Sequence, residues 1–286
     1  MTSVDAGIID LMLVIMNGLV ADGLTALQPL VTLFLAFSLL LACATALMVY
    51  FGHESLMLMW TMLKFMLGWT LIAGAMANWV FLTNALLNTA AAAGLSIAGH
   101  QLTVDQFLAP GTMAVAGASI TNKTQEYLNT LGWTAIYKPH QILAMSLMTT
   151  ITGVVWVLLA MHQVVSIFLF RFLSLFGFLG LAFLLAPALR WFGASLVRLT
   201  ISSTMQIFAL AAWSSVLVVL IPKIITLQVA EPSLWRITLA MGISIFLFCM
   251  TIGIPLVAAL GAFSATGMVL ARPLRAAQRM ATGRIL

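Results

Sequence analysis

The sequence predicts an all-α, polytopic integral membrane protein with about five transmembrane helices, an amphipathic N-terminal helix and a helical loop between the spans. Of its 286 residues, 63% are hydrophobic and only 7% are charged, whereas an average soluble domain is about 25% charged. Several runs exceed the roughly 20 apolar residues that cross a bilayer. The net charge of +5 rests on few residues, so it reports membrane orientation and not a nucleic-acid surface.

Residues 1 to 26 are expected to form an amphipathic segment. Within it, residues 3 to 24 read as a helix that lies on the membrane, because apolar side chains recur at helical spacing on one side. The N-terminus lacks a basic region, so a cleaved signal peptide is not expected. Three acidic residues in so short a stretch argue against spanning: Asp5, Asp10 and Asp22.

Residues 27 to 88 are assigned to a first transmembrane pair. One span is the uncharged stretch Leu27 to Gly52, and the other runs from Phe65 to Leu87. Lys64 leaves two alternatives at the start of the second span. We favour a lysine that snorkels to the interface, because it lies on a polar helical face. The alternative places it inside a span, where an ionisable group indicates function.

Residues 89 to 140 are assigned to a central loop, although polar residues gather from Thr83 onward. A small-residue helix is expected from Ala85 to Gly99, and its small side chains would let another helix approach closely. Thr103 to Gln106 has the pattern of a capping box, and Pro110-Gly111 is expected to end the short helix that follows.

The second half of this loop shows weaker patterns. Residues Gly111 to Ile120 are nearly all small or β-branched, so this stretch is expected to have little shape of its own and to pack on a neighbour. One or two helical turns are expected from Thr124 to Leu131. Pro139 is at a favoured first-helical position and should begin the next hydrophobic helix.

Residues 141 to 262 are assigned to a C-terminal transmembrane block. Its expected spans are Ile142 to Phe170, Thr200 to Ile221 with Pro222 as its end, and Ile237 to Leu260. Whether Phe172 to Ala188 crosses separately is left open. Residues 263 to 286 form a basic tail, in which arginines share one helical face and anchor the chain on anionic lipid or dock a partner.

Positive charges do not decide the orientation. With five spans and an outside N-terminus, eight of the twelve Lys and Arg residues lie inside; six spans with both ends inside also give eight. The absence of basic residues before Lys64 favours an outside N-terminus, so we expect five spans. The five-span inside set is Lys64, Arg171, Arg190, Arg198, Arg272, Arg275, Arg279 and Arg284, and six spans exchange Lys64 and Arg171 for Lys123 and Lys138.

The sequence contains no recognisable catalytic motif. HExxH, GxSxG and P-loop patterns are absent, and no Asp or Glu falls within an expected span. We therefore expect no enzymatic activity, no cofactor and no metal site, and proton-coupled transport is weakly supported. His162 is expected to hydrogen-bond to a neighbouring helix, while Cys43 and Cys249 should behave as small apolar residues.

The order of these features resembles the TrbL family, the polytopic inner-membrane channel subunits of conjugation and type IV secretion machines, related to the sixth VirB-class subunit. The similarity covers about residues 25 to 260, and the long hydrophilic tail of many TrbL proteins is missing. The residues that carry it are Leu67-Gly68-Trp69, Asn78-Trp79, Asn84-Ala85-Leu86-Leu87-Asn88, Phe107-Leu108-Ala109-Pro110-Gly111 and Gly117.

The resemblance implies a bacterial inner-membrane protein with a periplasmic N-terminus and central loop and a cytoplasmic C-terminus. It also implies a homo-oligomeric ring in membrane lipid, contact with pilin and an inner-membrane ATPase complex, and transient contact with translocated DNA or protein. The rival hypothesis is a stand-alone small-molecule transporter or channel, with Lys64, Arg171 or His162 as substrate contacts.

Two groups of residues are the candidates for these roles. The first group would pack the central loop against other copies, and the second would place charges at the membrane interface. The packing candidates are Asn84, Asn88, Ala92, Gly94, Gly99, Pro110, Gly111 and Gly117; the interface candidates are Lys64, Arg171, Arg272, Arg275 and Arg279.

Overall fold

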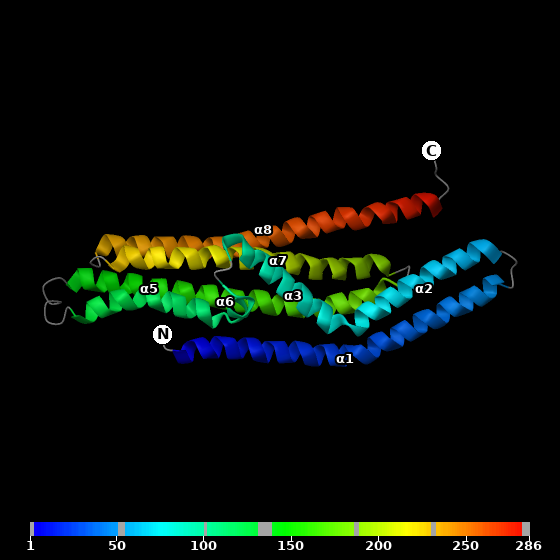
Figure 1. The fold of residues 1–286 in the computed structure, drawn as a ribbon, viewed down its shortest axis with the longest axis horizontal. Coiled ribbons are helices and arrows are strands. Elements are labelled where there is room, and N and C mark those ends of the chain that lie inside the picture. Colours follow the sequence, from blue (N-terminus) through cyan, green and yellow to red (C-terminus); the bar gives the residue numbers. More distant parts are fainter. Residues whose placement is uncertain are drawn as a thin grey trace. The chain divides into compact units, whose positions relative to one another are not determined.

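The chain folds almost entirely into α-helices (Figure 1), as a computed structural model shows. No strand occurs in the residues that the structure describes, so the predicted all-α membrane fold is confirmed. These residues are 3–50, 55–99, 102–130, 139–185, 189–229 and 233–281.

The chain divides into two compact units. Several helices contribute residues to both, because the unit boundaries fall inside α1, α3, α6, α7 and α8. Unit 1 comprises Met1–Met16, Leu87–Leu169 and Thr204–Ala259, and unit 2 comprises Asn17–Leu86, Phe170–Ser203 and Leu260–Leu286.

Helix α1 is a single helix from Ser3–Tyr50, and Pro29 lies within it. The helix expected over residues 3 to 24 therefore continues beyond residue 26, and within the described residues the apolar stretch of spanning length is Gly7–Leu40. The expected span Leu27 to Gly52 extends into residues outside the described part of the structure. A lone glycine or proline weakens a helix without having to end it when packing compensates. Here Val31 is only 1% exposed and belongs to the core of unit 2, which favours continuation.

Helices α2 (Ser55–Ala77) and α3 (Trp79–Leu95) meet at Asn78. The apolar part of α2, Phe65–Ala77, is bent by 73° against α3, so the second expected span is not straight. The Asn78 side-chain amide donates to Gly74 O at 2.9 Å, the same carbonyl that accepts its backbone N–H at 3.2 Å. Asparagine competes in this way with the helix backbone, which explains a bend at this position.

The central segment begins as expected. Helix α3 passes into a 3-10 turn, Ser96–Ala98, closed by Gly99 with a φ of 81° that favours glycine. The capping box at the start of α4 (Val104–Leu108) is confirmed, because Thr103 Oγ1 accepts from Gln106 N at 3.2 Å and Gln106 Oε1 accepts from Thr103 N at 3.0 Å.

Helix α5 spans Gly111–Thr130 without interruption. The prediction that Gly111 to Ile120 has little shape of its own is therefore wrong. The Asp10 carboxylate of α1 accepts a hydrogen bond from Gly111 N at 2.9 Å, and a negative charge at this end stabilises a helix. Burial of Met113, Ala114 and Ile120 supplies packing that intrinsic helix propensity does not.

The C-terminal block consists of α6 (Pro139–Phe183), α7 (Arg190–Val229) and α8 (Leu234–Ala281). Pro139 begins α6, as predicted. Phe172 onward continues α6, so the alternative of a separate crossing finds no support up to residue 185, and Ala188 lies outside the described residues.

The expected end of a span at Pro222 is also wrong, because α7 continues through it. Proline removes one helical hydrogen bond, but Ile221 and Ile224 on either side are buried and hold the helix in place. By length and composition, four described helices are able to cross a membrane, and a fifth span is added if the bent α2–α3 pair is one crossing.

Each unit has its own core. In unit 1, α5 runs beside α6 and α7 beside α8 (Figure 1), and Trp156, Phe107 and Leu210 are among the side chains with less than 2% exposure. In unit 2, residues of α1, α2, α3 and α6 form a cluster of buried side chains: Val31, Met76, Trp79, Phe178 and Ala182.

Candidate assembly surface and polar sites

Two of the predicted packing glycines make close contacts inside unit 1. A Cβ added at Gly117 of α5 would overlap Trp156 Cβ of α6 and lie 2.6 Å from Trp156 Cγ. A Cβ added at Gly94 of α3 would lie 2.5 Å from Phe208 O and 2.8 Å from Ala211 Cβ of α7. The absence of a side chain thus lets helix backbones approach within this chain.

The other predicted packing residues separate into buried and exposed positions. Pro110 and Gly111 are buried at the start of α5, whereas Gly99 is exposed and serves as the left-handed cap. Asn88 and Ala92 are exposed on α3. These two positions are one helical turn apart, so they lie on the same exposed face of α3 in unit 1.

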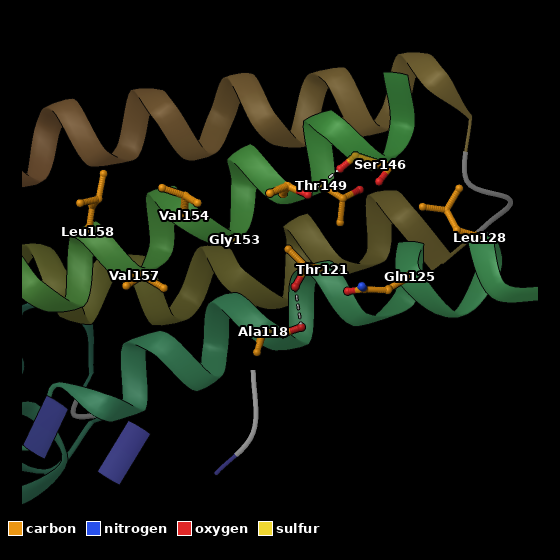
Figure 2. A pocket seen from close by; sticks show the side chains of 11 residues that line it. Ala118, Thr121, Gln125, Leu128, Ser146, Thr149, Gly153, Val154, Val157 and Leu158 are labelled. Atoms are coloured by element: carbon orange, nitrogen blue, oxygen red, sulfur yellow. Dashed lines mark hydrogen bonds between the residues drawn. The ribbon is translucent and has the colours of Figure 1, made fainter. Parts of the chain in front are cut away.

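A groove of about 380 Å³ lies between α5 and α6 in unit 1 (Figure 2). Figure 2 shows Thr121 and Gln125 of α5 facing it, together with Thr149 and Gly153 of α6. Thr121 Oγ1 donates to Ala118 O at 3.1 Å and Thr149 Oγ1 to Met145 O at 2.8 Å. These hydroxyls therefore bond within their own helices. The lining residues of the groove include no charged side chain.

A guanidinium and an amide from distant parts of the sequence meet in unit 2. Arg171 Nη1 donates to Asn84 Oδ1 at 2.9 Å, although 87 positions separate the two residues. Sequence reasoning had placed Asn84 in a packing set and Arg171 at the membrane interface, and the pairing itself was missed. Arg171 is half-buried, and its Nε is buried without a hydrogen-bond partner among the described residues.

Two cavities lie along α1 in unit 2. The first has a volume of about 190 Å³ and includes Arg171 in its lining. The second has a volume of about 260 Å³ and is mainly apolar. Leu24, Trp79 and Val80 line both, so the two cavities are adjacent.

Neutral polar side chains cross-link the helices of unit 1. Trp156 Nε1 donates to Ser244 Oγ at 3.2 Å, and Trp213 Nε1 donates to Thr251 Oγ1 at 2.8 Å. Gln163, which is 1% exposed, donates to Phe107 O at the end of α4. The sequence indicates such a contact, because Gln163 is an amide within an apolar run. Residue spacing does not predict its partner.

His162 of α6 lies against the backbone of Thr251 on α8, and its Nε2 is buried without a hydrogen-bond partner among the described residues. The expected bond to a neighbouring helix stays a prediction. Cys43 and Cys249 are free and exposed. Within the described residues, no group of three or more His, Cys, Asp or Glu side chains is arranged to hold a metal ion.

The remaining interface candidates give no side-chain geometry. Lys64 falls within α2, and Arg272, Arg275 and Arg279 fall within α8. Their side chains lie outside the described part of the structure, so their predicted role at the membrane interface stays a prediction.

Comparison with models of known protein families finds no match to this chain, and comparison with curated proteins finds none either.

Proposed function

We propose that this protein is an inner-membrane structural or channel subunit of a type IV secretion machine of the conjugative type. The resemblance of residues 25 to 260 to TrbL proteins supports this function, and the multi-pass helical architecture is consistent with it. In this proposal a homo-oligomeric ring supports pilus assembly and substrate translocation. Pilin and an inner-membrane ATPase complex are its partners, and the ATPases supply the energy.

The organisation of the central segment carries the proposal. Helix α5 is fixed at its start by Asp10 and along its length by α6, so the segment is an ordered part of unit 1. Asn88 and Ala92 on α3 stay exposed beside this framework. An ordered segment with an outward face of small residues suits close packing between helices of neighbouring copies.

The proposal is tested by Ala92→Trp in a conjugative donor that lacks its own copy of this protein. Because Ala92 is exposed, the bulky side chain should leave the fold intact and block contact between copies. We expect loss of both the large membrane complex, detected after mild solubilisation, and DNA transfer to recipient cells. Gly117→Trp is unsuitable, because Gly117 contacts Trp156 in the same chain.

Val257→Trp is the matched control. Val257 is 70% exposed on α8 in the same unit, so this variant also adds a surface tryptophan and should keep complex formation and transfer. If Ala92→Trp supported normal transfer, the proposed assembly face would be wrong. If the purified wild-type protein catalysed solute flux in liposomes as a monomer, a stand-alone transporter would replace the secretion subunit.

The proposed orientation has a separate test at Asn122, which is exposed on α5. In a background with Cys43→Ala and Cys249→Ala, Asn122→Cys should react in intact cells with a membrane-impermeant maleimide. Labelling would support an outside central segment and a bent α2–α3 pair that crosses once. Labelling only after lysis would contradict the proposed orientation.

A further inference from the structure

We infer that unit 2 contains a binding site for a phospholipid whose head group carries hydrogen-bond donors, such as phosphatidylglycerol. The phosphate would lie at Arg171, and an acyl chain would follow the two adjacent cavities along α1. These cavities are called the lipid groove below. The inference rests on the contacts of unit 2 and does not depend on the proposed secretion function.

The first argument is the charge of Arg171. This guanidinium lines the smaller cavity, and Asn84 supplies it with a neutral oxygen. No carboxylate lies within ion-pair distance of Arg171 among the described residues. A guanidinium in an apolar environment is stabilised by an anion, and a phosphate matches its planar set of donors.

The second argument is the pair of polar atoms that the protein leaves unsatisfied near this cavity. Arg171 Nε is a buried donor and Asn17 Oδ1 is a buried acceptor, and neither has a hydrogen-bond partner within the part of the chain that the structure describes. Both residues line the cavity. A phosphate oxygen suits the donor, whereas the acceptor requires an O–H or N–H donor. The head group of phosphatidylcholine has neither, because its quaternary ammonium carries no hydrogen.

The other polar groups of this cavity are already engaged. Thr83 Oγ1 donates to Trp79 O at 3.0 Å, and Thr25 Oγ1 donates to Asp22 O at 2.7 Å. Ser174 likewise donates to Arg171 O of its own helix. The unused hydrogen-bonding capacity is therefore concentrated at Arg171 and Asn17.

The third argument is the shape of the lipid groove. The cavity at Arg171 adjoins the larger apolar cavity through the shared wall of Leu24, Trp79 and Val80. The larger cavity is lined further along α1 by Val31 and Leu35, and its polar lining residues are Gln28 and Thr32. A charged end followed by a mainly apolar channel fits an amphiphile better than a free anion, because a phosphate can reach Arg171 while an acyl chain fills apolar space that a free anion leaves empty.

The inference is tested by native mass spectrometry of the full chain in mild detergent, titrated with phosphatidylglycerol or with phosphatidylcholine of the same acyl chains. We expect wild-type protein to retain one phosphatidylglycerol in preference to phosphatidylcholine. Arg171→Gln should weaken phosphatidylglycerol retention about tenfold, because a charge-assisted hydrogen bond is lost. Arg171→Lys keeps the charge and should retain more lipid than Arg171→Gln.

Two further variants keep the test decisive if Arg171→Gln folds poorly. Val80→Trp should narrow the lipid groove where its two cavities meet. It should weaken retention of both lipids while leaving Arg171 in place. Arg190→Gln is the matched control, because Arg190 is exposed in the same unit and donates to Leu184 O instead of lining the groove. It should retain lipid as the wild type does.

Two results would overturn the inference. Equal retention of both lipids by wild type and Arg171→Gln would mean that acyl chains bind without recognition of the head group. Displacement of phosphatidylglycerol by inorganic phosphate at similar concentration would mean that Arg171 holds a free anion, with no contribution from an acyl chain.

Discussion

The interiors of the two units use different polar chemistry. In unit 1, tryptophan N–H groups bond to side-chain hydroxyls, Trp156 to Ser244 and Trp213 to Thr251. In unit 2, Trp79 Nε1 instead donates to a backbone carbonyl, Ser174 O, at 3.1 Å, and a guanidinium lies nearby. Buried polar atoms without a hydrogen-bond partner among the described residues occur in both units, but in unit 2 they include the guanidinium Nε atoms of Arg171 and Arg198. A cation in an apolar environment is stabilised by an anion.

The neutral hydrogen bonds of unit 1 hold helices together, whereas the guanidinium of Arg171 in unit 2 is suited to binding an anion. Hydrogen bonds between helices in membrane proteins contribute about 0.6 kcal/mol on average, so the neutral pairs of unit 1 adjust the stability of a fold that packing already determines. Burial of Arg171 without an anionic partner lowers the stability of unit 2, so the stability of this unit should depend on whether an anion is bound. The following variants are ordered from the largest expected effect to the smallest.

Gly117→Leu should produce the largest loss of stability. A Cβ at this position already overlaps Trp156, so a leucine must push α5 away from α6. Overpacking costs about 1 to 3 kcal/mol and sometimes more, and backbone-level contact places this variant at the upper end. The melting temperature in detergent, followed by fluorescence-detected size-exclusion chromatography, should fall clearly.

Gly153→Ala is the control for this comparison. Its new Cβ would meet only Thr121 Cγ2 at 3.7 Å, an ordinary contact in the same α5–α6 groove. The melting temperature should stay close to that of the wild type. Equal losses for both variants would show that α5 and α6 do not pack as closely at Gly117 as the structure indicates.

Asp10→Ala should have an intermediate effect centred on the start of α5. It removes the carboxylate that accepts from Gly111 N, and loss of such a cap costs about 1 kcal/mol. Amide hydrogen exchange in the first turn of α5 should accelerate roughly fivefold. Asp22→Ala, at an exposed position of the same helix, should leave this exchange unchanged; a similar acceleration would assign the effect to α1 as a whole.

Trp156→Phe should have the smallest lipid-dependent effect, because it removes one neutral hydrogen bond and some buried packing in unit 1, and neither involves the lipid groove. Its loss of stability should be the same with and without phosphatidylglycerol. Arg171→Gln should instead lose the stabilisation that this lipid adds to the wild type. A lipid-dependent effect of Trp156→Phe would remove the proposed distinction between the two units.

Local chemistry in the sequence predicts several features well. Thr103 and Gln106 determine the start of α4 through side-chain bonds three positions apart, and Pro139 starts α6 because the first turn needs no N–H from it. The class of fold follows from composition alone. These predictions succeed because the interacting groups are neighbours in sequence.

The failures have a common physical cause. The expected boundaries near residue 26 and at Pro222 rest on local signals, but α1 and α7 continue through them, and Val31, Ile221 and Ile224 are buried near these positions. The sequence likewise indicates candidate packing residues but not the residues that they contact. Contacts between Gly117 and Trp156, or between Arg171 and Asn84, depend on helix arrangement that spacing does not encode.

The length of α6 has a geometric consequence. Its 45 residues extend about 67 Å at 1.5 Å per residue, while the hydrocarbon core is about 30 Å thick. Even a tilt of about 40° leaves more than 25 Å of α6 outside that core. At least one end of α6 therefore lies outside the hydrocarbon core, among lipid head groups or water.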